Sequence, residues 1–161
     1  MPTNERNVAV PAKVRLFLVA LLVFLMLLPV PVASAATLTP ASGNGMITNS
    51  VPTVLQSADG TTILSLASTS SFTGTFTGTS VAHATCVVRA SGQGICQGPE
   101  KFTGTVAGHP GTVDFFDVYT ISGDAVQGRA VITGGTAALG GDVSFQGTGT
   151  NFTYAGRIIV P

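Results

Sequence analysis

The sequence predicts an all-β protein folded as a small, strongly curved barrel, and three observations support this fold class. An aromatic residue, a polar residue, Gly and Thr follow one another four times, beginning at Phe72, Phe76, Phe102 and Phe145. Runs of strand-forming residues succeed one another and are separated by turns that contain glycine. Beyond the apolar segment near the start, no stretch has the spacing of an amphipathic helix.

The repeated pattern also predicts which face of the sheet is buried. Because side chains alternate between the two faces of a strand, Phe72, Gly74, Phe76 and Gly78 share one face and the intervening threonines share the other. Glycines let a sheet bend and leave room for rings from facing strands. We therefore expect the Phe/Gly face to point into the barrel and the Thr face to point outward.

The first segment, residues 1–35, has the features of a secretory signal peptide. Three basic residues precede an unbroken apolar run at 16–28, two prolines follow, and Ala-Ser-Ala at 33–35 matches a cleavage site. We expect cleavage after Ala35, a secreted (extracellular) product, and no stable membrane anchor afterwards. The alternative is an uncleaved anchor, because the apolar stretch approaches the length of a membrane-spanning helix.

The remaining chain is one domain, with a flexible lead-in at 36–49 and a barrel at 50–161. A short helical turn is expected at 136–141. The expected strands cover 51–57, 61–67, 71–81, 82–89, 95–105, 112–121, 125–133, 142–147 and 152–160.

The two cysteines, Cys86 and Cys96, flank a turn-rich stretch at 90–94. If that stretch folds back as a hairpin with equal arms, the two cysteines lie opposite each other, where an antiparallel pair can form a disulfide. An exported protein with an even number of cysteines favours this bridge. Metal binding and a catalytic thiol are the alternatives, but two sulfurs are too few ligands and no His/Asp partner can be argued.

Glycine spacing over residues 70–148 resembles that of an uncharacterised bacterial family similar in fold to allene oxide cyclase and to plant dirigent proteins. The resemblance rests on the segments 102–112, 123–129, 135–141 and 145–147. It implies a single antiparallel barrel of about eight strands. It implies no activity, and no catalytic residue of the cyclases or dirigent proteins can be transferred to this chain.

Candidate ligand-binding residues lie on the most aromatic expected strand, at 112–120. Asp117 and Tyr119 share a face with Val113 and Phe115, which the family comparison turns inward. An inward carboxylate beside a phenol at a barrel mouth can bind or protonate a ligand. The alternative is that Asp117 is a hydrated group at a strand end. Arg129, on the next strand, is expected to pair with Asp114 or Asp117.

Other reactive residues are isolated. His83 has no partner in the sequence, and His109 belongs to a Gly-His-Pro-Gly turn. Residues 151–153 match a glycosylation sequon, but the bacterial appearance of the chain predicts no modification. No nucleophile elbow, phosphate loop, metal-binding helix or dinucleotide fingerprint occurs, so we assign no catalytic residue, metal or cofactor. Without a basic stripe, nucleic-acid binding is disfavoured.

Three functional classes remain. In order of preference, they are a binding module for a small hydrophobic molecule or a partner, a structural or cell-surface barrel, and a cofactor-free cyclase or isomerase. Whether the chain is an enzyme, and whether it forms a homo-oligomer, stay open. A cavity of a few hundred Å³ with Asp117 or Tyr119 at its mouth would favour ligand binding. An interior filled by phenylalanine rings would favour the structural class.

Overall fold

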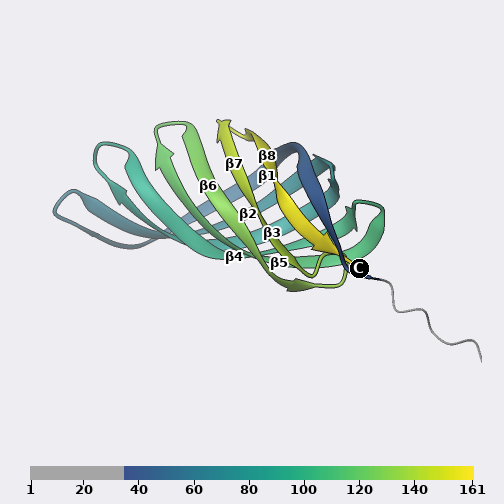
Figure 1. Ribbon diagram of the computed structural model, residues 1–161. Coiled ribbons are helices and arrows are strands. Elements are labelled where there is room, and N and C mark those ends of the chain that lie inside the picture. Colours follow the sequence, from purple (N-terminus) through teal and green to yellow (C-terminus); the bar gives the residue numbers. More distant parts are fainter. Residues whose placement is uncertain (1–34) are drawn as a thin grey trace, which may run out of the picture. The chain divides into compact units, whose positions relative to one another are not determined.

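Eight antiparallel strands form a closed, barrel-like ring in which each strand pairs with its sequence neighbours and the last pairs with the first (Figure 1). The computed structural model describes residues 35–161, and none of these residues is helical. The predicted fold class is confirmed. The predicted signal peptide lies, except for Ala35, outside the described residues. The strands are β1 (Thr37–Ala58), β2 (Thr61–Gly74), β3 (Phe76–Arg89), β4 (Gln93–Val106), β5 (His109–Ser122), β6 (Ala125–Gly135), β7 (Gly140–Thr148) and β8 (Asn151–Val160).

Short hairpin turns connect most of these strands. Between β1 and β2, Asp59 and Gly60 both have positive φ angles, of 49° and 72°. Two positive φ angles match the twist of paired strands, and Asp-Gly is a preferred sequence for such a turn. The turns of β1–β2, β3–β4, β5–β6 and β7–β8 fan out along one end of the ring (Figure 1). We call this the hairpin end.

The expected flexible lead-in at 36–49 is wrong, because these residues form the first half of β1. Residues Thr37–Met46 pair with β8, and the pairing with β2 begins at Gly43. The glycines that made the segment look flexible have a packing role. A Cβ on Gly43 would collide with Tyr154, and one on Gly45 would collide with the Phe152 ring.

The expected single strand at 71–81 is also wrong, because the chain reverses at Thr75. Gly74 has a φ of 105°, and Phe72 pairs with Gly78 across the resulting β2–β3 hairpin. The predicted orientation is nevertheless confirmed. Phe72 and Phe76 both pack in the interior core, while the threonines of β3 that follow Phe76 are exposed.

The connection between β6 and β7 contains no helical turn, contrary to expectation. Ala137 and Ala138 are fully buried, and the backbone N–H groups of Thr136 and Ala137 donate hydrogen bonds to the carbonyl of Thr112. This segment therefore lies against β5 and covers the end of the interior, which a solvent-exposed helical turn would not do.

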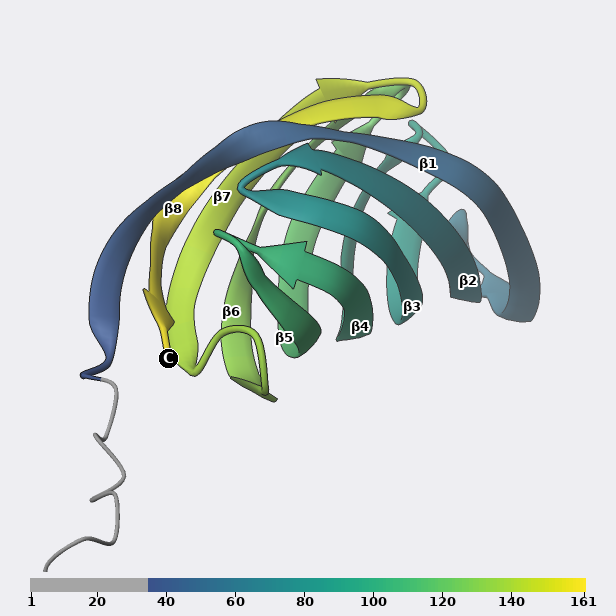
Figure 2. The same ribbon diagram turned by 90° about the vertical axis from the view of Figure 1, so that its right-hand side faces the viewer.

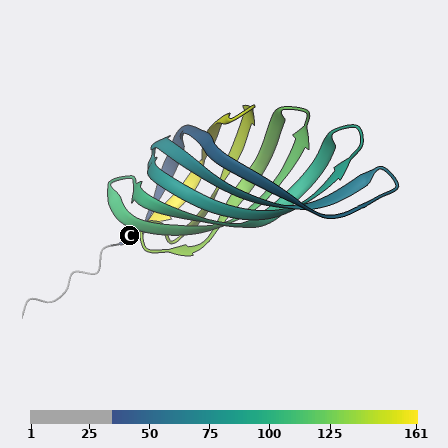
Figure 3. The ribbon, with the colours of Figure 1, turned by 180° about the vertical axis from the view of Figure 1, so that it is seen from behind.

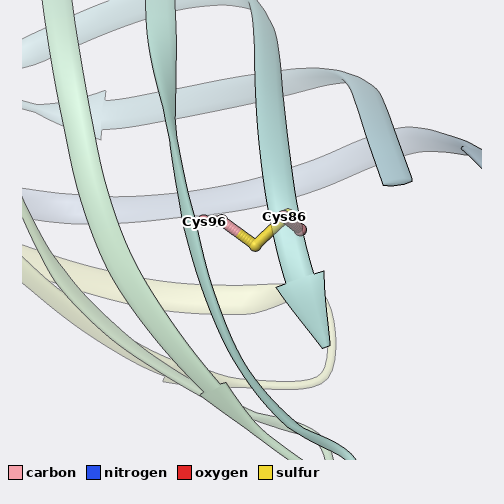
Figure 4. The surroundings of a disulfide bond; sticks show 2 residues. All are labelled: Cys86 and Cys96. Carbon is pink, nitrogen blue, oxygen red and sulfur yellow. A yellow bond between two sulfur atoms is a disulfide. The ribbon is translucent and has the colours of Figure 1, made fainter. Parts of the chain in front are cut away.

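The interior holds two groups of buried side chains. Figure 2 shows the strands arching side by side around this common interior. The larger group lies away from the hairpin end and includes Phe76, Phe102, Val106, Val113 and Ile158. The smaller group surrounds a disulfide between Cys86 on β3 and Cys96 on β4, which face each other in the register (Figure 4). The predicted bridge and the equal-arm hairpin are confirmed.

The β1–β2 hairpin reaches beyond the rest of the ring (Figure 3). Its β1 arm pairs with β8 only as far as Met46 and afterwards pairs with β2 alone. The two strands β1 and β8 therefore diverge at Ile47, whose N–H bonds to the carbonyl of Thr150. Within residues 35–161, no helix has the length and apolar character needed to cross a membrane.

Candidate functional site

A cavity of about 300 Å³ occupies the part of the interior nearer the hairpin end, and residues from all eight strands line it. Its walls are mainly apolar and aromatic, with Phe72, Phe115, Phe145 and Phe152 among them. Apart from Pro99 on β4, the solvent-exposed lining residues lie where β1 leaves β8 and in or beside the β5–β6 and β7–β8 turns. The cavity therefore opens toward the hairpin end. Its exposed lining residues, which form the mouth, include Ser50, Gly123, Asp124, Ala125 and Gly149.

Strand β5 supplies the polar wall of this cavity. Val113, Phe115, Asp117 and Tyr119 all point inward, as alternation along the strand predicts, and the last three line the cavity. Asp117 is only 6% exposed. It therefore does not behave as a hydrated strand-end group, which was the alternative interpretation of this residue.

A second carboxylate, Glu100 on β4, lines the same cavity. The sequence analysis did not select it, although a signal was present. Cys96, Gly98, Glu100 and Phe102 alternate onto one face of β4, so a buried Phe102 and a buried disulfide both predict an inward Glu100.

The electrostatics of the site are dominated by Asp117 and Glu100. The pKa of Asp117 is raised from 3.8 to about 9, first by burial and then by the negative charge of Glu100 and a hydrogen bond with that carboxylate. Asp117 is therefore protonated at neutral pH. The Oδ1 atom of Asp117 has no hydrogen-bond partner within residues 35–161.

Tyr119 stands between the acidic pair and the disulfide. Its ring centroid lies 6.0 Å from that of Phe145, and it packs against the buried disulfide group from β5, where it pairs with Cys96. Burial raises the pKa of Tyr119 to about 12, with smaller contributions from the charges of Asp117 and Glu100. Its phenol therefore stays protonated and available as a hydrogen-bond donor.

Arg129 does not join the other predicted site residues. It lies on the outer face of β6, with its side chain 61% exposed, and its Nε donates to Asp142 at 3.0 Å. The expected pairing with Asp117 or Asp114 is wrong, since Asp114 pairs instead with Lys101 at 3.7 Å. The reason is alternation along β6, where Ala130 and not Arg129 faces the interior.

The histidines lie outside the cavity. His83 is exposed on β3, and His109 is the first residue of β5, after a turn at Ala107 and Gly108. Both results agree with the isolated positions that the sequence indicated.

Side chains fill one part of the interior and leave the other part hollow. Phe102 belongs to the filled part, while Phe72, Phe76, Phe115 and Phe145 line the cavity. A hydroxyl also stays unpaired in this interior, because Ser80 is 2% exposed and its Oγ has no partner among the described residues. The arrangement offers an enclosed apolar space with an acidic pair and a phenol on one wall.

A model for a family described as protein of unknown function (DUF3224) matches residues 41–155. The chain belongs to the DUF3224 family. The matched segment contains most of the barrel, including the acidic pair and the disulfide. The expectation of an uncharacterised family is thus confirmed. No comparison links the chain to allene oxide cyclases or dirigent proteins, so that likeness stays a prediction.

A solved structure of another DUF3224 protein has the same fold. That protein, of unknown function and from Shewanella oneidensis MR-1, superposes with a TM-score of 0.61 at 12% sequence identity, covering 78% of this chain and 99% of the other. At this identity the likeness concerns the fold alone. No curated protein matches the chain.

Proposed function

We propose that this DUF3224 protein is a secreted binding module that holds one small, largely hydrophobic molecule in its barrel. The observation that carries the proposal is the cavity of about 300 Å³ with a buried carboxylate, Asp117, on its wall. Enclosed apolar spaces of this size with a few polar groups are typical of ligand sites. Closed barrels of about eight strands hold one small ligand at most.

Two features support export. The expected signal peptide precedes the barrel, and the structure contains the disulfide Cys86–Cys96, a bond that persists in oxidising compartments. The buried acidic pair is not needed to hold the barrel together, because the strand ladders close the ring without it. Burying a carboxylate without a partner is costly, and a bound molecule would offset that cost.

A second candidate function is a cofactor-free cyclase or isomerase, in which the barrel folds a substrate against its aromatic walls. Protonated Asp117 favours it, because a carboxylic acid inside an apolar cavity can donate a proton to a bound substrate. This enzyme would use the same cavity, so the binding experiment below is the first test of both candidates.

The test is titration of the purified protein with N-phenyl-1-naphthylamine, an uncharged apolar dye that becomes fluorescent out of water. We expect saturable binding at one site per chain. Ala82→Phe, which places a ring where an inward side chain of β3 lines the cavity, should abolish it. The matched control, Thr85→Phe, places the same ring on the outer face of the same strand and should bind as the wild type does. The proposal would be overturned if Ala82→Phe bound the dye as tightly as Thr85→Phe does, or if the wild type did not bind the dye.

A further inference from the structure

We propose that the molecule held in this cavity is a small organic cation, with an amine or quaternary ammonium head against Asp117 and Glu100 and an apolar body against the aromatic walls. This inference rests on the proposed binding function and specifies its ligand class. It follows from the charges around the cavity, the unsatisfied carboxylate, and the chemistry of the rings beside it.

Acidic groups face the cavity without any basic side chain to balance them. Glu100 and Asp117 lie on its wall and Asp124 at its mouth, and no Lys, Arg or His occurs among the lining residues that the structure describes. The four basic residues of the strands lie on exposed positions: Arg89, Lys101, Arg129 and Arg157. Even with Asp117 protonated, the carboxylates of Glu100 and Asp124 keep the net charge of the cavity negative.

The position of Asp117 makes this acidic wall unusual. The residue is 6% exposed, it points into the cavity, and its Oδ1 atom has no hydrogen-bond partner within the described barrel. The neighbouring negative charge, on Glu100, has no basic partner among the lining residues, and a charge taken out of water is retained at lower cost when it is paired. A ligand ammonium would pair with Glu100, and an amine head would also donate a hydrogen bond to Asp117. An anionic ligand would be repelled by Glu100, and a neutral hydrocarbon would leave that charge unpaired.

The neighbouring rings suit the same head group. Phe115 and Tyr119 lie on the strand of Asp117, and Phe145 lies within ring contact of Tyr119. The faces of such rings attract cations, and aromatic side chains are the usual partners of quaternary ammonium groups in proteins. The cavity volume of about 300 Å³ lies at the lower end of ligand pockets, so the ligand is a small molecule.

The experiment compares three probes of one shape that differ in charge. They are benzyltrimethylammonium, its uncharged carbon isostere neopentylbenzene, and the anionic 2,2-dimethyl-3-phenylpropanoate. Each is titrated into the purified protein at neutral pH, with displacement of the naphthylamine dye as the readout. We expect the cation to bind at least tenfold more tightly than the neutral isostere, and the anion to bind more weakly than either.

Variants then show which residues cause the preference for the cation. Glu100→Gln, which removes the charge beside Asp117, and the double variant Asp117→Asn/Glu100→Gln, which removes both carboxyl groups, should each reduce the cation's affinity at least tenfold while leaving the neutral isostere's affinity within twofold. The control, Asp114→Asn, removes a carboxylate from the outer face of β5 and should leave both unchanged. Binding of the neutral isostere also shows that a variant is folded. A variant that does not fold will bind none of the probes, and the test then rests on the other variant.

The outcomes separate this inference from the proposed function. A neutral isostere that binds as tightly as the cation, or a cation preference that survives both variants, overturns the cationic ligand and leaves the binding function in place. Failure of all three probes and of the dye overturns both. A cation preference lost in Glu100→Gln and in the double variant Asp117→Asn/Glu100→Gln and kept in Asp114→Asn supports the inference.

Discussion

Asp117 and Glu100 face one cavity from diagonal positions of the β4–β5 ladder. Asp117 lies opposite Gly98, and Glu100 lies opposite Phe115, two residues further along β4. Diagonal neighbours on one face of a sheet are within reach of long side chains. Burial of Asp117, and after it the negative charge of Glu100, keeps a proton on Asp117 at neutral pH.

This pair predicts that the protein loses stability as the pH rises. The pKa of Asp117 is 3.8 in its ordinary state and about 9 in the folded protein, so folding keeps a proton that the unfolded chain releases. The stabilisation from this proton is full below pH 3.8 and is lost as the pH rises toward 9. Glu100, Tyr119, Asp124 and Tyr154 are the other titratable groups that line the cavity with it.

Comparison with Asp117→Asn isolates the effect. The amide cannot ionise, so at pH 8 the variant should be more stable than the wild type by about 1–3 kcal/mol, the usual cost of an unsatisfied buried polar group. The difference should shrink as the pH falls toward 4. Urea unfolding at several pH values measures it. A variant that is less stable than the wild type at every pH would show that Asp117 has a structural role in the barrel.

The packing of Phe76 predicts a large effect of its removal. Its side chain is 2% exposed, and its ring lies 5.5 Å from those of both Phe102 and Tyr154. Phe76→Ala should lower the free energy of unfolding by about 3–5 kcal/mol. Thr79→Ala, on the exposed face of the same strand, should change it by less than about 0.5 kcal/mol. Chemical denaturation checks both, and the reverse order would contradict the register of β3.

Tyr154 is expected to hold the β2–β3 turn in place through its hydroxyl. The oxygen accepts a hydrogen bond from the backbone N–H of Phe76 at 2.9 Å and donates one to the carbonyl of Thr73 at 3.1 Å. Tyr154→Phe should cost about 1–3 kcal/mol, because it leaves a buried backbone donor unpaired. Amide exchange at Phe76 should speed up more than exchange elsewhere in β3. Unchanged exchange at Phe76 would show that this bond is not made in solution.

The disulfide predicts that the protein has no reactive thiol. Unfolded, unreduced protein should give no signal with a thiol reagent, and reduction should release two thiols from Cys86 and Cys96. Because the bridge closes a short loop, its loss should lower the free energy of unfolding by about 2–3 kcal/mol. Free thiols before reduction would contradict the bridge.

The sequence allowed the barrel and part of its site to be predicted, because alternation along a strand is simple. Burial of Phe115 places Asp117 and Tyr119 inside, and burial of Phe102 would have placed Glu100 inside by the same rule. The position expected for Arg129 was wrong. Which residues of β6 face the interior depends on how β6 pairs with β5, and the spacing of residues along β5 does not determine that pairing.

Glycines caused the other errors. At Gly43 and Gly45 they make room for rings on β8, although in the sequence they suggested a flexible segment. Gly74 allows a reversal inside what looked like one repeated strand. Whether a glycine marks a bend, a turn or a close contact depends on which strand lies across from it, and that pairing appears only in the folded chain.

Native mass spectrometry of the protein purified from the culture medium of its own host tests the central claim most directly. If the cavity is a ligand site, the wild-type chain should carry a small molecule that is retained under gentle conditions, released on unfolding, and missing from Ala82→Phe. We expect that molecule to be a cation. A wild-type chain that shows only the mass of its polypeptide, identical in behaviour to Ala82→Phe, would contradict the account and favour a structural role for the barrel.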